Sequence, residues 1–134
     1  VGADIWDKTN ANEDEKTFAK EVLGYRWRMS QAEASGKVYM LETANKCFKR
    51  GWTSEFCSKP NEKIYSVESP DGILPSGKNG ITIVQYADNN MAAGVACEMQ
   101  GYRTVVIGFP IEALKCGESQ KTLMKSALNY LINK

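Results

Sequence analysis

The chain has 134 residues with 43% hydrophobic and 25% charged side chains, values that are ordinary for one globular domain with its own hydrophobic core. Its formal net charge is +1 without a basic stripe, and its apolar runs are far shorter than a bilayer-spanning helix, so we expect no nucleic-acid partner and no membrane insertion. The chain contains no histidine, which excludes Ser-His-Asp and Cys-His catalysis and zinc sites with histidine ligands.

The first predicted element is a helix over residues 13–23. Asn12 precedes it as an N-cap, and Glu15 stands three residues later, which is the spacing of a capping box. Apolar residues then recur at helical spacing, and Gly24 is suited to end the helix. A second short helix or turn is predicted over residues 30–34, and a short strand over residues 37–41.

Residues 42–63 form a long polar stretch without helical or strand periodicity, which predicts a loop with at most one turn of helix. Phe48, Trp52 and Phe56 recur in it four residues apart, a spacing that would place them on one face of a helix. They could line a ligand groove or a protein interface, or they could anchor the loop to the core. A disulfide between Cys47 and Cys57 would close the same loop. The cysteine spacings contain no C-x-x-C pair, so no metal site is expected.

The second half of the chain has the clearest periodicity. A strand is predicted over residues 64–67, followed by a turn at residues 69–72 and a loop over residues 75–80. Three strand-like runs over 81–86, 92–99 and 102–108 are separated by short polar connections, which predicts an antiparallel meander. Gly94 in the middle run indicates a bulge. A helix after Gly117 carries an apolar stripe that should lie on a sheet or on another helix. The stripe consists of Leu123, Met124, Ala127, Leu128, Leu131 and Ile132.

The stretch GFPIEAL, residues 108–114, ends the last of these strands and begins the connection to the final helix, LMKSALNYL. In this order the elements resemble the end of class I glutamine amidotransferase-like domains. Such domains of secreted bacterial multidomain proteins, described as xanthan lyase-like or amidase-associated, typically contain a Y-x-D-x-N-x-A-x-x-A pattern. Tyr86, Asp88, Asn90 and Ala92 match it, whereas Val95 stands where the last alanine is expected. The stretches GADIWDK, residues 2–8, and FAKEVLGYRW, residues 18–27, are also similar to these domains.

The resemblance implies an α/β fold of the flavodoxin-like and amidotransferase-like type, with a mixed sheet whose C-terminal portion is antiparallel and which helices flank. Residues 1–134 would then be a single domain and the C-terminal part of a larger amidotransferase-like domain. The resemblance also implies a protein that is secreted, periplasmic or on the cell surface. An uncovered sheet edge in such a part would favour a homodimer.

The catalytic triad of that family is not present in this chain. Phe109 and Pro110 stand where its histidine is expected, so only Glu112 could be carried over, and it would have no histidine to orient. Glu112 would then cap or pack the loop before the last helix. No phosphate-binding glycine pattern occurs, so no cofactor is expected. The expected function is a non-catalytic accessory or binding domain linked to polysaccharide or cell-wall processing, with a glycan or neighbouring domains of the same polypeptide as partners.

A second class of function stays open, a carboxylate-dependent hydrolase or lyase that acts on glycans. Its candidate catalytic residues are Glu112, Asp88 and Tyr86, and Asp71 could join the two carboxylates in glycosidic chemistry. A cleft that holds two of Glu112, Asp88 and Tyr86 within hydrogen-bond reach would favour the enzyme. A further group of residues could form an acidic sugar-binding edge with an aromatic platform: Asp4, Trp6 and Asp7.

Overall fold

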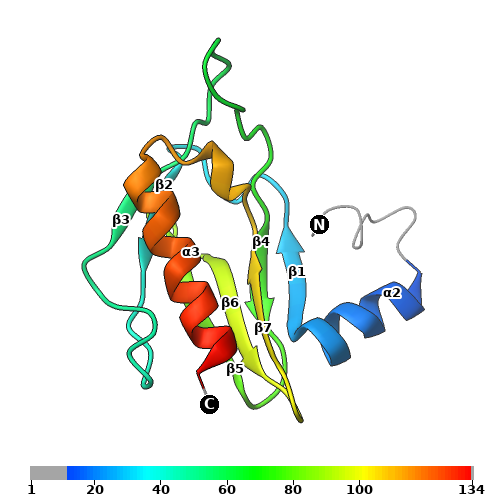
Figure 1. The fold of residues 1–134 in the computed structure, drawn as a ribbon. Helices are drawn as coiled ribbons and strands as arrows, with labels where there is room; N and C mark the ends of the chain where they lie inside the picture. The colour runs from blue at the N-terminus through cyan, green and yellow to red at the C-terminus, as the bar shows by residue number, and fades with distance from the viewer. Residues whose placement is uncertain (1–11, 134) are drawn as a thin grey trace.

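The fold comes from a computed structural model that describes residues 12–133. It is mostly antiparallel β, with a five-stranded sheet curled into a half-barrel, a two-stranded sheet, and a helix towards each end of the chain (Figure 1). The elements are, in chain order, α2 (Glu13–Phe18), the π-helical turn η1 (Ala19–Leu23), β1 (Tyr25–Met29), β2 (Lys37–Met40), β3 (Thr53–Glu55), β4 (Gly72–Pro75), β5 (Gly80–Tyr86), β6 (Ala92–Glu98), β7 (Arg103–Ile107), the 3-10 turn η2 (Ile111–Ala113) and α3 (Gly117–Ile132).

The predicted flavodoxin-like and amidotransferase-like α/β fold with a mixed sheet is wrong. The large sheet has the strand order β3-β2-β5-β6-β7, the small sheet pairs β1 with β4, and every pair among the described strands is antiparallel. A parallel pair needs a crossover of a dozen or more residues, usually a helix. Between β1 and β7 the chain forms no helix, and the connections of β5 to β6 and of β6 to β7 are short turns, so the topology has no βαβ unit.

The predicted N-terminal helix is confirmed over residues 13–23. The Asn12 side chain accepts the N–H of Glu15 at 2.8 Å, and the Glu15 carboxylate accepts the N–H of Asn12 at 3.2 Å, which completes the capping box. Gly24 ends the helix with a φ of 77°. A Cβ at this position would lie 2.5 Å from the Cβ of Cys97, so the helix end can approach the sheet this closely only with glycine.

Two strands between residues 25 and 75 were not predicted, and one predicted strand is absent. Residues 30–34, expected as a short helix or turn, bend without forming a helix, and residues 64–67 form no strand. The unpredicted strands are β1 and β4, and β4 extends from the last residue of the predicted turn, 72, to the first residue of the predicted loop, 75. The reason is the pairing of β1 with β4, which are more than forty residues apart, with Arg26 opposite Leu74 and Trp27 opposite Ile73. Local periodicity carries no information about such a distant partner.

The predicted meander of β5, β6 and β7 is confirmed, and so is the irregularity at Gly94. The β5–β6 register shifts on both sides of the Val84–Gly94 pair, which changes the side-chain alternation of β6. As a result Ala93 and Ala96 pack with the main core, whereas Ala92 and Val95 pack on the other face with residues of β1 and β4. The strand is therefore buried on both faces, and a polar side chain would be costly almost anywhere along it.

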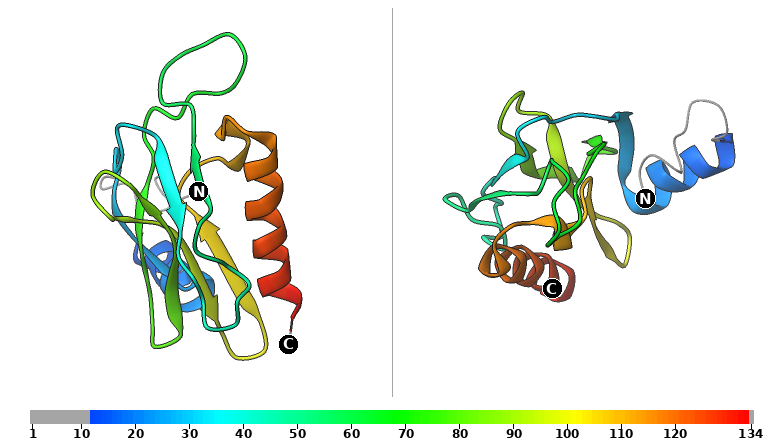
Figure 2. Two further views of the ribbon diagram at one scale, coloured as in Figure 1. Left: turned by 90° about the vertical axis from the view of Figure 1, so that its left-hand side faces the viewer. Right: turned by 90° about the horizontal axis from the view of Figure 1, so that it is seen from above.

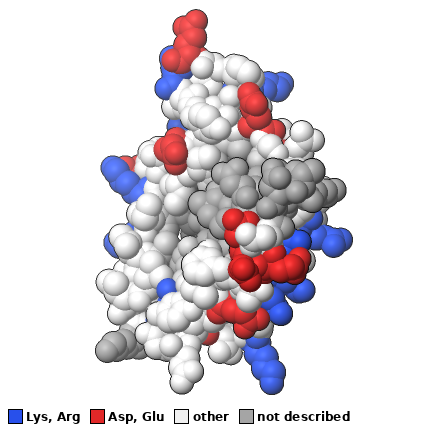
Figure 3. Space-filling view, turned by 90° about the vertical axis from the view of Figure 1, so that its right-hand side faces the viewer, with Lys and Arg blue, Asp and Glu red and all other residues white. Residues whose placement is uncertain are grey.

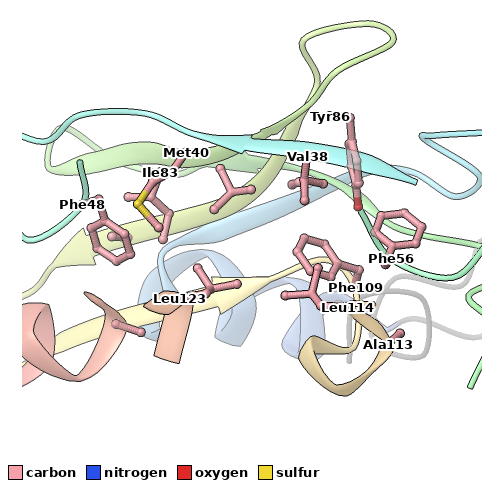
Figure 4. Packing of buried hydrophobic residues seen from close by; sticks show 14 of the residues in the cluster. Val38, Met40, Phe48, Phe56, Ile83, Tyr86, Phe109, Ala113, Leu114 and Leu123 are labelled. Atoms are coloured by element: carbon pink, nitrogen blue, oxygen red, sulfur yellow. The ribbon is translucent and has the colours of Figure 1, made fainter. Parts of the chain in front are cut away.

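The helix α3 lies along one face of the large sheet, as the side view in Figure 2 shows. The main core contains buried residues of both the sheet and α3. Leu123, Ala127 and Tyr130 face the sheet and are buried, and Figure 4 shows Leu123 among the core side chains. The predicted stripe on α3 is therefore only partly buried, because a helix that covers one face of a sheet needs only a narrow apolar face. The other members of the stripe are 41–71% exposed: Met124, Leu128, Leu131 and Ile132.

Two of the three loop aromatics belong to this core. Phe48 and Phe56 are fully buried, and Trp52 packs partly buried against the same cluster (Figure 4 shows the two phenylalanines). Residues 42–63 contain β3 but no helix, so the three side chains do not share a helical face. Phe56 stacks on Phe109, with ring centroids 5.2 Å apart. These contacts are those of side chains that anchor the long loop to the core.

Candidate functional site

The candidate site is a cleft of about 510 Å³ at one end of the large sheet. Five residues between Tyr65 and Asp71 line one wall, and five between Ile107 and Glu112 line the other, so the cleft lies where β7 ends and the loop before β4 returns to the body. In Figure 1 this loop projects from the top of the molecule, above β4 and β7. Strand-end loops on a rigid sheet are where folds commonly place binding groups.

A close backbone crossing at Asp71 and Gly108 forms the floor of the cleft. The N–H of Asp71 donates to the carbonyl of Gly108 at 2.8 Å, and the N–H of Gly108 donates to the carbonyl of Ala93 at 2.8 Å. A Cβ on Gly108 would lie 2.2 Å from the carbonyl oxygen of Asp71, which leaves room for glycine alone. The crossing therefore fixes the two walls of the cleft relative to the sheet.

Tyr86 supports this floor from below. Its hydroxyl donates to the Asp71 carbonyl at 2.8 Å, and its side chain is fully buried. Burial, together with the negative charges of Asp71 and Glu33, raises the pKa of Tyr86 well above its ordinary value. The hydroxyl therefore stays neutral and acts as a fixed hydrogen-bond donor. Tyr86 does not line the cleft.

The side chain of Asp71 is held on the inner side of the cleft. Its Oδ1 accepts the indole N–H of Trp27, on β1, at 3.0 Å. Only 7% of Asp71 is exposed. The pairing of β1 with β4 is what brings Trp27 to this position, since β4 begins immediately after Asp71. The carboxylate thus has a defined orientation at the edge of the small sheet.

The wall formed by residues 65–71 continues into a compact loop that begins at Cys57. A backbone hydrogen bond of 2.7 Å, from the N–H of Val67 to the carbonyl of Cys57, joins the ends of this loop. Within it, the Asn61 carboxamide oxygen accepts the N–H groups of Lys63 and Ile64 at 2.8 and 3.0 Å. These bonds organise the loop from its own residues. Tyr65 follows directly and is 63% exposed at the mouth of the cleft. Its ring is a large apolar surface that a ligand can contact.

The predicted disulfide between Cys47 and Cys57 is not formed, and all four cysteines are free thiols. The Cys57 sulfur accepts the Asn61 amide at 2.6 Å and donates to the carbonyl of Lys59 at 3.1 Å, whereas Cys47 packs against the main core. The hydrogen bonds of Asn61 organise residues 57–64, which follow the loop that the disulfide was expected to close. Cys116 is exposed before α3, where N–H groups of the first helical turn lower its thiol pKa, but it does not line the cleft.

Asp88 belongs to a second cluster of carboxyl groups, beside the turn that joins β5 to β6. The Ser35 hydroxyl contacts Oδ1 of Asp88 at 2.9 Å and Oε1 of Glu33 at 2.5 Å. The N–H of Asp88 donates to Oε2 of Glu33 at 3.3 Å. Burial is the main cause that raises the pKa of Glu33, while hydrogen bonds from Glu33 and Ser35 lower the pKa of Asp88. Neither carboxyl group lines the cleft.

The structure thus separates the candidate residues. Glu112 and Asp71 both line the cleft, whereas Asp88 points into the second cluster and Tyr86 lies beneath the floor. Glu112 does not cap α3: its side chain is exposed on η2, and only its backbone carbonyl accepts the Gln120 amide, at 3.3 Å. The arrangement does not place two of Glu112, Asp88 and Tyr86 in one cleft.

The cleft also has functional groups that the sequence did not single out. Glu68 adds a third carboxylate to Asp71 and Glu112, and Tyr65 adds the exposed ring. The only sequence signal for this wall was the turn at residues 69–72, which placed Asp71 in a loop. In the described part of the chain no three His, Cys, Asp or Glu side chains are arranged to hold a metal ion. The predicted sugar-binding edge of Asp4, Trp6 and Asp7 lies outside the described residues.

Acidic side chains also gather over α2, as Figure 3 shows on the face that carries this helix. Glu13 and Glu21 form ion pairs with Lys16 and Lys20 of the same segment, at 3.1 and 3.4 Å. Such exposed pairs within one helix contribute little to stability. The pocket on this surface has a volume of about 250 Å³, against about 510 Å³ for the cleft at the strand ends, and it is lined by Asn12, Asp14, Glu15 and Phe18.

Comparison with protein-family models, with curated proteins and with solved structures finds no match for this chain. Within residues 12–133, no helix has the length and apolar character that crossing a bilayer requires. Function is therefore argued from the geometry of the cleft.

Proposed function

We propose that this chain is a binding domain whose strand-end cleft holds a neutral glycan. The observation that carries the proposal is the combination of an exposed ring, Tyr65, with carboxylates on both walls, Glu68 and Glu112. A sugar presents an apolar C–H face and a rim of hydroxyl groups. The tyrosine ring can pack against the C–H face. The carboxylate oxygens, which only accept hydrogen bonds, can accept them from the sugar hydroxyl groups.

The rigid floor supports binding rather than catalysis. The Asp71–Gly108 crossing and the Tyr86 hydroxyl hold the two walls in place before any ligand arrives, which limits the entropy lost on binding. A glycan-cleaving site needs two suitably placed acid or base groups near the scissile bond, and a raised pKa for the acid. The candidate groups Asp88 and Tyr86 lie outside the cleft, so neither is placed beside Glu112 as a catalytic partner. The link to secreted, polysaccharide-processing bacterial proteins rests on the sequence resemblance.

Calorimetric titration with soluble oligosaccharides tests the proposal. We expect a neutral oligosaccharide, such as a cello- or chito-oligomer, to bind, and a uronic-acid oligomer to bind more weakly because Glu68, Asp71 and Glu112 repel its carboxylates. Tyr65→Ala should weaken binding about tenfold or more, whereas Tyr65→Phe keeps the ring and should retain most of the affinity.

Glu112→Gln should weaken binding by a smaller factor, because the amide still offers one acceptor oxygen. Glu118→Gln is the matched control, since Glu118 is also an exposed glutamate but lies on α3 away from the cleft lining. An affinity that is the same in the wild type, Tyr65→Ala and Glu112→Gln would contradict binding in this cleft. The absence of heat with both cello- and chito-oligomers would contradict the proposed ligand.

A further inference from the structure

We infer that Glu33, Ser35 and Asp88 form a proton-sharing latch, which holds the 32–36 segment against the β5–β6 turn in acid and weakens when Glu33 loses its proton. The contacts of the Ser35 hydroxyl carry this inference. Its oxygen lies 2.5 Å from a carboxyl oxygen of Glu33 and 2.9 Å from one of Asp88. A hydroxyl has a single proton to donate, so it cannot satisfy two carboxylates. One of the two carboxyl groups must therefore carry a proton of its own.

The remaining contacts indicate which group holds that proton. The N–H of Lys37 donates to the Ser35 oxygen at 3.2 Å, which leaves one lone pair for a second donor. Asp88 is exposed, and its two oxygens accept the hydroxyl and the N–H of Ser35, at 2.9 and 3.2 Å. The same N–H also contacts Oε1 of Glu33 at 3.3 Å, so it is shared by the two carboxyl groups and does not distinguish them. Glu33 is only 8% exposed, and burial favours its neutral form. The consistent arrangement has Glu33 donating to Ser35, and Ser35 donating to an ionised Asp88.

Charges around the latch strengthen this assignment. Glu33 faces Asp88 on the β5–β6 turn and Tyr86 on β5, and the carboxylate of Asp71 lies near the same tyrosine. In the described part of the chain neither Glu33 nor Asp88 forms an ion pair. Ionisation of Glu33 would therefore place two like charges on one hydroxyl without a cation to offset them. The hydrogen bond between Glu33 and Ser35 would be lost.

The latch is joined to the wall of the cleft through the backbone. The Asn89 amide, on the same turn as Asp88, donates to the carbonyl of Ala32 at 2.6 Å, and the N–H of Ala32 donates to the carbonyl of Pro70 at 3.0 Å. Pro70 immediately precedes Asp71 on the cleft floor. Release of the 32–36 segment would loosen this support. An effect on glycan affinity rests on the proposed function, whereas the latch itself does not.

Carbon-detected NMR of the side-chain carboxyl groups, recorded on the full chain across acidic to neutral pH, tests the latch without any ligand. We expect the midpoint of Glu33 in the folded chain to lie above that of glutamate in the urea-unfolded chain, and the midpoint of Asp88 to lie below that of aspartate in the unfolded chain. In Asp88→Asn, the midpoint of Glu33 should move down towards the unfolded value. A folded-state midpoint of Glu33 at or below the unfolded value would overturn the inference.

Amide hydrogen exchange tests whether the latch holds the 32–36 segment in place. In the wild type, the protection factor of the Ala32 N–H should fall several-fold as the pH rises through the Glu33 midpoint. In Glu33→Gln, whose amide can still donate to Ser35, it should stay constant over the same range. Equal pH dependence in the two proteins would overturn the latch. If the carboxyl titration and the exchange behave as expected but no oligosaccharide binds, the proposed function fails and the latch stands. If an oligosaccharide binds but the midpoint of Glu33 is the same in the folded and the unfolded chain, the latch alone fails.

Discussion

Two groups of carboxyl side chains lie at the same end of the sheet, and they differ in what surrounds them. In the cleft, Glu68 and Glu112 line opposite walls that open to solvent. In the latch, Glu33 and Asp88 converge on one serine hydroxyl and satisfy each other. The comparison shows that residue type does not decide the role of a carboxylate. Those that line an open cleft are available to a ligand, and those that meet at a shared hydrogen-bond donor hold the fold together.

We expect the largest loss of stability from a substitution that disrupts the backbone crossing of Asp71 and Gly108. Gly108→Ala should lower the free energy of unfolding by about 3 kcal/mol or more, because its Cβ would overlap the Asp71 carbonyl at 2.2 Å and force the crossing apart. Gly117→Ala is the matched control, since a Cβ there has no neighbour within 4 Å and alanine favours the helix. Urea unfolding of both variants checks this. Equal stabilities would show that the crossing tolerates a side chain and is not the rigid floor described above.

Removal of the Tyr86 hydroxyl should cause the next largest loss of unfolding free energy. Tyr86→Phe removes the buried donor to the Asp71 carbonyl and should cost about 1–3 kcal/mol in unfolding free energy. Tyr102→Phe removes a hydroxyl that donates to the Val22 carbonyl at 2.9 Å near the surface, and should cost less than about 0.5 kcal/mol. Thermal unfolding of the two variants at the same pH compares them. A larger loss in Tyr102→Phe would contradict the importance assigned to the cleft floor.

The pH dependence of stability should separate Glu33 from the cleft carboxylates. Because the pKa of Glu33 is raised in the folded state, the wild type binds more protons when folded, and its stability should fall as the pH rises from the unfolded value of 4.5 through the folded pKa. Asp88 has the opposite effect because its pKa is lowered in the folded state. The stability that its ionised form contributes is lost as the pH falls from the unfolded value of 3.8 through the folded pKa. Stability should therefore be greatest in mild acid.

Glu33→Gln tests this sign, because glutamine cannot ionise. We expect the variant to gain stability relative to the wild type as the pH rises, measured by denaturant unfolding at a series of pH values between about 4 and 8. Glu118→Gln should follow the wild-type curve. A wild type that becomes more stable than Glu33→Gln with rising pH would show that the folded state favours the ionised form of Glu33.

The smallest effect on stability is expected for the cleft itself. Glu112→Gln should change the free energy of unfolding by no more than about 0.5 kcal/mol, because the side chain is exposed and lies apart from the core. Calorimetric unfolding checks this value beside the loss of glycan affinity in the same variant. A strongly destabilised Glu112→Gln would mean that Glu112 is a structural residue, and its role in the cleft would have to be abandoned.

The elements that the sequence predicted correctly are those with local causes. The capping box of Asn12 and Glu15 and the hairpins of β5–β7 need only neighbouring residues. By contrast β1 and β4 are strands because each pairs with the other, and Trp27 reaches Asp71 across 44 positions of the sequence. The resemblance that implied a flavodoxin-like sheet rested on short stretches, and such stretches do not determine how strands pair.

The candidate site was predicted in part for the same reason. Glu112 was placed correctly at a strand end, since the strand before it and the turn that follows are both local features. Tyr65 and Glu68 lie in a loop without periodicity, and nothing near them in sequence indicates the opposite wall. The contact of Ser35 with Asp88 spans 53 positions, so neither Glu33 nor Ser35 could be recognised as its partner before the fold was known.

Mapping of glycan-induced chemical shifts on the backbone amides of the full chain tests the central claim most directly. On titration with a neutral oligosaccharide, we expect saturable shifts that are concentrated at residues 65–71 and 107–112, with small changes on α3. Shifts confined to α3 or to α2, or no shifts at millimolar oligosaccharide, would contradict a glycan site in the strand-end cleft.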